Sequence, residues 1–205
     1  MRPGRDHLVD ILHGDRLDLD EGGLESVTFR KLADRLGVQS PTLFWHIKNK
    51  AVLLTALSEA ILGPTLAALR APAPGERWQD WLTYFAEQFR QAMIVHPDGA
   101  RVVSLAQLSL AVTGLSERAM NTLVEFGLPL RDARLTVLAV QRFTIGHVLE
   151  EQAPRPDEKM LADFDYSADD YARDFPTVVA AVKEYFEPGR TVDDLFRDTL
   201  RLILT

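Results

Sequence analysis

Apolar residues recur along most of the chain at the i, i+3 and i+4 spacing of amphipathic helices, and strand-like alternation bounded by turns is absent. This pattern predicts an all-α protein. Capping residues, glycines and prolines mark the expected helix ends, so that Asn49 begins a helix and His96-Pro97 interrupts one. The helices expected after Asn49 include the apolar positions from Val52 to Ala60, and then cover residues 78–95, 98–107, 113–126, 130–152, 176–186 and 191–204.

Two stretches interrupt the helical pattern. The proline-rich segment RAPAPGE at residues 70–76 is typical of a turn between domains. We therefore expect a first domain at residues 1–70 and a second domain at residues 71–205. The acidic, proline-punctuated segment QAPRPDEKMLADFDYSADD at residues 152–170 predicts a mobile loop.

The N-terminal quarter contains two short helical patterns joined by a glycine turn, in the segment LADRLGVQSPTLFWHI. Two helices joined in this way are typical of a helix-turn-helix, whose second helix reads base edges in the major groove. Thr28 is expected to cap the first helix, and Ser40 the second, with Pro41 at its first position. An earlier helix that begins near Leu8 completes a three-helix head. The hydroxyl groups of Ser40 and Thr42 can bond bases, and Pro41 can contact a thymine methyl group.

Charge supports a nucleic-acid partner for this head. The chain carries a net charge of −7, yet residues 26–50 hold five basic side chains against Asp34 alone. A local excess of this kind is an electrostatic footprint for a polyanion, and Lys48 and Lys50 are placed to contact phosphates. A solvated helix face is the alternative interpretation of the same charges.

Composition excludes several other classes of protein. The absence of cysteine rules out disulfides, thiolate zinc sites and cysteine nucleophiles. Uninterrupted apolar runs fall short of the roughly 20 residues that a membrane span needs, and the N-terminus lacks an apolar signal core. We therefore expect a cytoplasmic protein without a membrane partner.

The segment VTFRKLADRLGVQSPTLFWHIKNKAVLL, residues 27–54, resembles the DNA-binding region of the tetracycline repressor (TetR) family. It follows the family pattern T-x-R-x-L-A-x-x-L-G-V-x-x-x-x-L-Y-x-H-[VIF]-x-x-K-x-x-L, except that Phe44 replaces a tyrosine whose hydroxyl often reaches a phosphate. The resemblance implies a transcriptional repressor that binds double-stranded operator DNA. With the caps and lysines above, the expected DNA-binding residues are Thr28, Arg30, Ser40, Pro41, Thr42, Phe44, Trp45, His46, Lys48 and Lys50.

Three later segments, WQDWLTYFAEQFRQAMIVHPDGARVV, FTIGHVLEEQ and LFRDTLRLIL, are similar to the ligand domain of tetracycline repressors within that family. The resemblance implies a C-terminal helical domain for ligand binding and dimerisation. In the implied homodimer, the helices after Leu130 and Thr191 pair with their mates across a twofold axis. Such a dimer reads a palindromic operator, and a small-molecule inducer releases it.

The positions that bind magnesium-tetracycline in that subgroup are mostly replaced here. Val103 stands where the subgroup has the histidine that holds the magnesium ion, and Phe85 and Ala119 stand where it has polar residues that clamp the drug. These replacements argue against magnesium-tetracycline and favour a larger apolar or aromatic ligand. The expected pocket residues are Phe85, Phe89, Val103, Leu105, Gln107, Ala119, Leu123, Arg142, Phe143 and Glu150, of which the polar members would orient the ligand.

His147 and Glu150 lie one turn apart on one helix face, a spacing that helix bundles use for metal sites. No second carboxylate–histidine pair accompanies them, and a polar patch or a hydrogen bond at a dimer interface explains them as well. We therefore expect no metal site, no cofactor and no enzymatic activity. The alternative functions for an all-helical chain are a metal-carboxylate enzyme and a helical adaptor protein.

Overall fold

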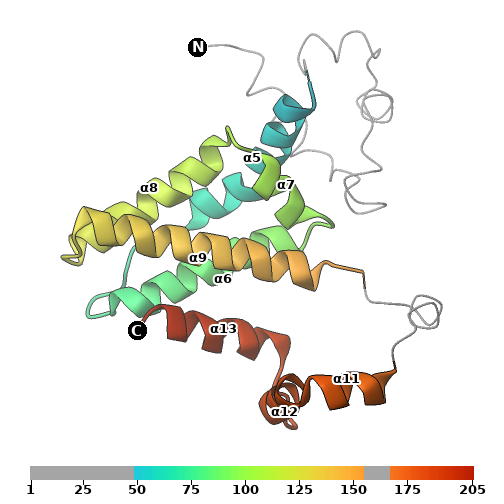
Figure 1. The fold of residues 1–205 in the computed structure, drawn as a ribbon. Helices are drawn as coiled ribbons and strands as arrows, with labels where there is room; N and C mark the ends of the chain where they lie inside the picture. Colours follow the sequence, from blue (N-terminus) through green and yellow to red (C-terminus); the bar gives the residue numbers. More distant parts are fainter. Residues whose placement is uncertain (1–48, 155–166) are drawn as a thin grey trace, which may run out of the picture. The chain divides into compact units, whose positions relative to one another are not determined.

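A computed structural model of the chain describes residues 49–154 and 167–205 (Figure 1). These residues form helices and no strand, which confirms the predicted all-α class. The three-helix head expected in residues 1–48 lies outside the described part of the chain. The helices are α5 (Lys50–Ala68), α6 (Trp78–Ile94), α7 (Gly99–Leu105), α8 (Leu110–Glu125), α9 (Leu130–Glu151), α11 (Ala168–Asp174), α12 (Pro176–Tyr185) and α13 (Val192–Ile203).

The chain divides into two compact units, residues 1–152 with Leu204 and residues 153–203 with Thr205. In the first unit, α5 contacts α6, α7 and α8, and α9 also contacts α6, α7 and α8. In the second unit, α11 contacts α12. The domain boundary predicted at residue 70 falls in the connection between α5 and α6, and it stays a prediction.

Helix α5 contributes a large part of the core of the first unit. Asn49 caps its start as predicted, because the Asn49 Oδ1 accepts a hydrogen bond from the Val52 N–H at 3.0 Å. Its 19 residues and mean hydropathy of 1.6 would suffice for a membrane span, and among the described helices it alone meets that test. The buried core helix of a soluble protein meets it too, and α5 packs in that way. Its buried side chains are Leu53, Leu54, Ala56, Leu57, Ser58, Ile61 and Leu62.

A sharp corner joins α6 to α7. His96 and Pro97 follow the end of α6 as predicted, Asp98 adopts the left-handed conformation with φ of 58°, and Gly99 opens α7. Glycine is needed there because a Cβ atom on Gly99 would lie 2.1 Å from the Met93 carbonyl oxygen. The corner therefore depends on the absence of a side chain at its last position.

Helices α8 and α9 lie side by side (Figure 1). Helix α8 begins at Leu110, before the predicted start at residue 113, because Ser109 caps it: the Ser109 Oγ accepts a hydrogen bond from the Val112 N–H at 3.2 Å. Helix α9 agrees with its predicted extent to within one residue. Its buried positions follow helical spacing along one face: Ala133, Val137, Val140, Gln141, Thr144 and Val148.

The second unit contains a helix that the sequence analysis missed. Residues 152–170 are predicted to be a loop, but α11 begins among them at Ala168. Ser167 and Asp170 form a capping box, in which the Ser167 Oγ accepts from the Asp170 N–H at 3.1 Å and the Asp170 carboxylate accepts from the Ser167 N–H at 3.3 Å. This local signal outweighs the acidic composition that favoured a loop. Helices α12 and α13 agree with their predicted extents to within one residue at each end.

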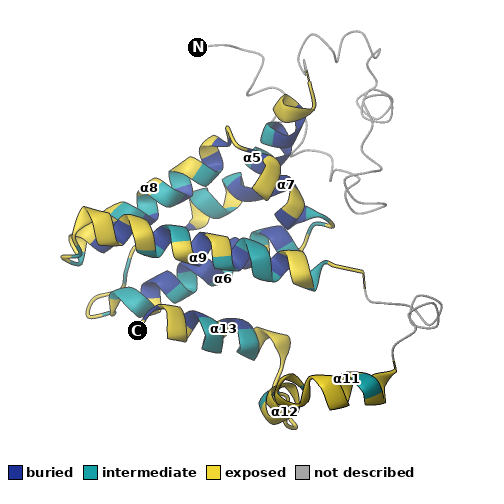
Figure 2. Ribbon diagram, viewed as in Figure 1, coloured by how far each residue is buried: buried dark blue, intermediate teal, exposed yellow. Residues whose placement is uncertain are grey.

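Burial differs strongly among the helices (Figure 2). Each helix from α5 to α9 buries side chains, and these five helices of the first unit enclose the apolar core in which a ligand pocket was expected. Helices α11 and α12 bury none, and α13 buries Phe196 and Leu200. The largest fully buried side chains of the first unit are Trp81, Phe85, Phe89, Leu57, Leu62, Leu82, Met93, Leu115 and Leu123.

Candidate ligand-binding and regulatory site

The apolar residues predicted to line a ligand pocket lie in the core of the first unit. Phe85 and Phe89 of α6 stack in a row with Trp81, and the ring centroids lie 6.0 Å apart for Trp81–Phe85 and 6.3 Å apart for Phe85–Phe89. Helix α6 contacts α7 and α8, which contribute the other apolar members of the predicted set. The predicted pocket residues that are buried are Phe85, Phe89, Val103, Ala119 and Leu123.

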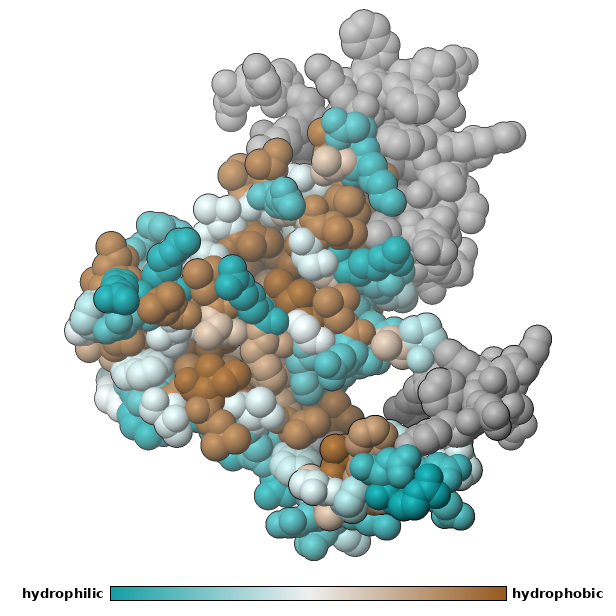
Figure 3. All heavy atoms as spheres, viewed as in Figure 1, coloured by the Kyte–Doolittle hydropathy of each residue, from teal (hydrophilic) through white to brown (hydrophobic). Residues whose placement is uncertain are grey.

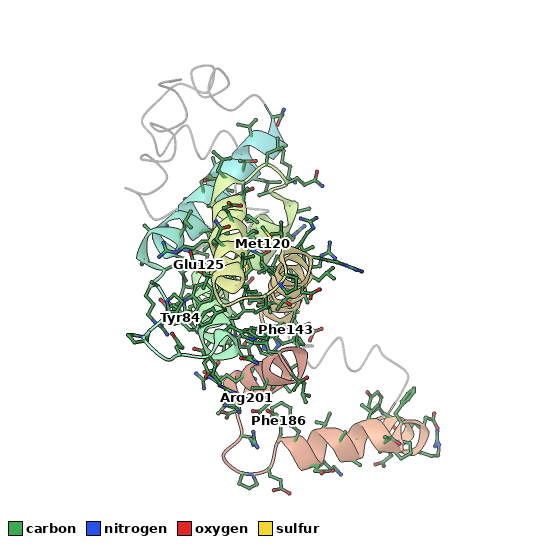
Figure 4. All side chains as sticks on the ribbon, turned by 90° about the vertical axis from the view of Figure 1, so that its left-hand side faces the viewer. Tyr84, Met120, Glu125, Phe143, Phe186 and Arg201 are labelled. Atoms are coloured by element: carbon green, nitrogen blue, oxygen red, sulfur yellow. The ribbon has the colours of Figure 1, made fainter. Side chains whose placement is uncertain are left out.

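The polar residues predicted to orient a ligand lie elsewhere. Phe143, labelled in Figure 4, is half-buried on α9, and its ring centroid lies 5.6 Å from that of His147. The exposed members of the predicted set are Leu105, Gln107, Arg142 and Glu150. The chain thus gathers most of the apolar part of the predicted set in its core and leaves the polar part at the surface.

A buried ion pair that the sequence analysis did not predict joins α6 to α9. Arg90 donates two hydrogen bonds to the Glu151 carboxylate, from Nε to Oε2 at 2.9 Å and from Nη2 to Oε1 at 2.5 Å. The two side chains are only 6% and 12% exposed, and His147 Nε2 lies 3.8 Å from Glu151 Oε2. A planar two-bond pair has a narrow geometry, so it fixes the register of the two helices.

The position of Arg90 is the signal that could have revealed this pair. Arg90 stands four residues after Ala86 and three before Met93, on the buried face of α6, where a guanidinium needs a counter-charge. His147, considered for a metal site with Glu150, has Glu151 as its nearby carboxylate. Within residues 49–154 and 167–205, no group of three His, Cys, Asp or Glu side chains could hold a metal ion.

Gln152, directly after α9, holds the corner between α6 and α7. Its Nε2 donates hydrogen bonds to the carbonyl oxygens of Met93 at 3.1 Å and His96 at 2.7 Å, and its Oε1 accepts one from the Ala100 N–H at 3.2 Å. One side chain therefore satisfies main-chain groups at the end of α6 and at the start of α7. These bonds position the short helix that carries Val103.

A second polar contact joins α5 to α8. Glu59 of α5 accepts hydrogen bonds from the N–H groups of Leu110 and Ala111, the first two residues of α8. Beside it, the buried Ser58 Oγ donates to the buried Ser109 Oγ at 3.1 Å. Because the first N–H groups of a helix have no partners within the helix, Glu59 completes the start of α8.

The connection between α5 and α6 is ordered by its own side chains. Arg70 forms two hydrogen bonds of 2.7 Å with the Glu76 carboxylate, and its guanidinium lies 4.2 Å from the ring centroid of Tyr84. The bond from Arg70 and the bond from the Ala73 N–H lower the pKa of Glu76 to about 2. The Trp81 Nε1 donates to the Arg70 carbonyl oxygen at 3.2 Å, which attaches the connection to α6.

Of the predicted DNA-binding residues, the structure describes Lys50 alone. Lys50 is exposed at the first residue of α5, and in the chain it follows directly on the predicted helix-turn-helix. The other DNA-binding predictions lie outside the described residues and stay predictions: Thr28, Arg30, Ser40, Pro41, Thr42, Phe44, Trp45, His46 and Lys48.

Both parts of the chain match known protein families. Residues 71–205 match the family "Tetracyclin repressor-like, C-terminal domain". Residues 19–57 match the family "Bacterial regulatory proteins, tetR family". The first match includes α6, which carries the buried aromatic row, and the second covers the predicted helix-turn-helix.

Individual proteins agree with these matches. The chain is 41% identical over 135 residues to tetracycline repressor protein class E of Escherichia coli, and the match covers 66% of this chain and 64% of that repressor. The chain therefore spans less than two thirds of the length of this relative.

Two solved structures are similar in fold to this chain. A TetR-family transcriptional regulator from Streptomyces coelicolor is 35% identical, with a TM-score of 0.62, over 87% of this chain and 99% of that one. A TetR variant from Acinetobacter baumannii AYE, in complex with minocycline, is 28% identical, with a TM-score of 0.67, over 100% of this chain and 94% of that one.

Proposed function

The chain belongs to the TetR family, and we propose that it is a ligand-responsive transcriptional repressor that binds a palindromic operator as a homodimer. The observation that carries this proposal is the presence of both family matches in one chain, at residues 19–57 and at residues 71–205. A DNA-binding motif followed by a helical regulatory unit has the two parts that such a switch needs.

The interior of the first unit supports an apolar or aromatic inducer. Phe85 and Phe89 form a stacked row, and Val103 and Ala119 are buried apolar residues of the same core. The related Acinetobacter protein was solved with minocycline, so a ligand site within this fold has precedent. We propose that this chain binds a small molecule other than magnesium-tetracycline among these side chains.

An outward stripe on α9 supports the homodimer. Leu135, Leu138, Ile145 and Leu149 follow one another at spacings of three, seven and four residues, which place them on one face of α9, different from the buried one. Leu135 and Leu149 are exposed in the single chain. Figure 3 shows hydrophobic side chains at the surface on which α9 lies. We propose that α9 pairs with its mate in a second copy through this stripe.

The family also bears on activity and location. The relatives named above are transcriptional repressors and regulators. We therefore propose that the chain catalyses no reaction, requires no cofactor and acts in the cytoplasm.

Titration of DNA binding against salt tests the proposal. We expect the affinity for random-sequence duplex DNA, measured by fluorescence anisotropy, to fall steeply as salt rises. Lys50→Ala should reduce the slope by about one unit, because one phosphate contact is lost. Lys183→Ala, which removes an exposed lysine of α12, is the matched control and should leave the slope unchanged. A parent slope of zero would favour the metal-carboxylate enzyme or the adaptor instead.

A further inference from the structure

The carboxylate of Glu59 in α5 forms a polar contact with the first residues of α8. The Glu59 Oε1 accepts hydrogen bonds from the Leu110 N–H at 2.5 Å and from the Ala111 N–H at 3.2 Å. The Glu59 Oε2 accepts a further bond from the Ala111 N–H at 3.1 Å. A negative charge at this end of a helix also interacts favourably with the helix dipole. Glu59 therefore binds α8 through main-chain groups that no substitution in α8, other than proline, would remove.

A second, apolar contact joins the same two helices farther along. A Cβ atom on Gly114 of α8 would lie 2.7 Å from Leu66 Cδ2 of α5, so the helices approach each other closely at this point. The two contacts lie on either side of Pro64, which stands within α5. Proline has no N–H to donate, so α5 lacks one of its own hydrogen bonds between the contacts. The polar bonds of Glu59 and Ser58 therefore add to the apolar packing that holds the part of α5 before Pro64 against its neighbours, and they fix it to the start of α8.

This part of α5 leads directly into the predicted DNA-binding segment. Asn49 caps α5, and the sequence of residues 32–47 before it predicts a helix-turn-helix. At its other end the contact reaches α8, whose buried face carries Ala119 and Leu123 of the predicted ligand pocket. Glu59 thus joins the helix that follows the predicted head to a helix that carries part of the proposed ligand site.

We propose that Glu59 is a positioning residue for DNA recognition: by fixing the first part of α5 on the start of α8, it sets the separation at which the dimer accepts two operator half-sites. This inference rests on the proposed function. One inserted base pair moves a half-site by about 3.4 Å and rotates it by about a tenth of a turn, so a dimer with firmly held heads discriminates between spacings.

Operator selection followed by spacing variants tests this role. Duplexes are first selected from a randomised library with the parent protein, and the selected palindrome is then resynthesised with one or two base pairs inserted between its halves. The preference is the ratio of affinities for the original palindrome and for the lengthened ones. We expect this ratio to be about tenfold lower for Glu59→Ala than for the parent, which equals about 1.4 kcal/mol. Glu59→Gln keeps one acceptor oxygen and should retain part of the preference. Affinity for random duplex DNA should not fall in either variant.

Gln141→Ala is the matched control, because Gln141 is buried and, unlike Glu59, forms its hydrogen bonds between α9 and α8, with Ser116. It should keep the parent's spacing preference. The proposal is overturned if Glu59→Ala keeps that preference, or if Gln141→Ala loses it equally, since a general loss of stability would then explain the effect. If Glu59→Ala does not fold, Glu59→Gln decides by the same criterion. A parent protein that selects no duplex contradicts the proposed function itself, which is a different result.

Discussion

The first and second units are ordered by different interactions. Helices α5 to α9 each bury side chains in a common core, within which Arg90 and Glu151 form a two-bond pair. In the second unit, helices α11 and α12 bury none and α13 buries Phe196 and Leu200, and polar contacts such as the capping box of Ser167 with Asp170 are exposed. A buried polar group that loses its partner gains no water, whereas an exposed one does. Removal of a hydrogen-bond partner should therefore lower the free energy of unfolding far more in the first unit than in the second.

The largest effect is expected from Glu151→Ala. This change leaves the Arg90 guanidinium buried without its carboxylate partner, which should lower the free energy of unfolding by about 3–5 kcal/mol. Urea denaturation followed by circular dichroism measures the loss. Asp80→Ala, which removes the partner of Arg77 in an exposed ion pair, is the control and should cost little. Equal losses of unfolding free energy in the two variants would show that a buried ion pair stabilises this chain no more than an exposed one.

Close packing in the first unit should make Gly99→Ala the next most costly change. The new methyl group would lie 2.1 Å from the Met93 carbonyl oxygen, so the corner between α6 and α7 must shift, at a cost of about 1–3 kcal/mol. At Gly146 of α9 a Cβ atom meets nothing within 4 Å, and Gly146→Ala should stabilise the chain by about 0.5–1 kcal/mol. The midpoint of thermal unfolding should therefore fall for Gly99→Ala and rise for Gly146→Ala.

A smaller effect, visible only in acid, is expected for Glu76. Its pKa falls from an ordinary 4.5 to about 2 in the folded chain, chiefly through the hydrogen bond from Arg70. The carboxylate therefore stabilises the fold fully above about pH 4.5, and this contribution is lost as the pH falls from 4.5 towards 2. As the pH is lowered across this range, the free energy of unfolding should fall less steeply for Glu76→Gln than for the parent. Identical slopes would mean that the bond to Arg70 does not persist in solution.

The smallest effect should come from Tyr185→Phe in the second unit. The Tyr185 hydroxyl donates a hydrogen bond to the Asp198 carboxylate at 2.9 Å, and Arg190 and Arg201 also bind this carboxylate. The bond from Tyr185 is the largest cause that lowers the pKa of Asp198. Tyr185→Phe should therefore raise the pKa of Asp198 towards its ordinary value, measured by NMR titration, while the midpoint of thermal unfolding barely moves. A large change in that midpoint would contradict the contrast between the units.

The helices of the first unit could be predicted because each combines a clear boundary signal with a periodic apolar face. Asn49 and the His96-Pro97 pair mark boundaries that the structure confirms. The apolar pattern alone predicts a start for α8 at residue 113, whereas Ser109 caps the helix and it begins at Leu110. Helix α11 was missed because its acidic composition dominated the interpretation, although Ser167 and Asp170 carried a capping signal.

The candidate site was predictable only for its apolar part. Phe85 and Phe89 continue the buried face of an amphipathic helix, so periodicity places them in the core. Arg90 and Glu151 stand 61 residues apart, and nothing local in the sequence states that they meet. Glu59 and the start of α8 are likewise distant in the chain. Contacts between helices depend on how the helices cross, which the spacing along each helix does not determine.

The amide of Gln152 bears on which substitutions the corner between α6 and α7 can accept. Because the side chain of Gln152 bonds to peptide groups of Met93, His96 and Ala100, these bonds hold the start of α7 without involving the side chains of that helix. A carboxylate at this position could not donate to two carbonyl oxygens, so the clamp tolerates no such exchange. Under the proposed function, a substitution at Val103 would change what the core presents to an inducer while these main-chain bonds remain in place.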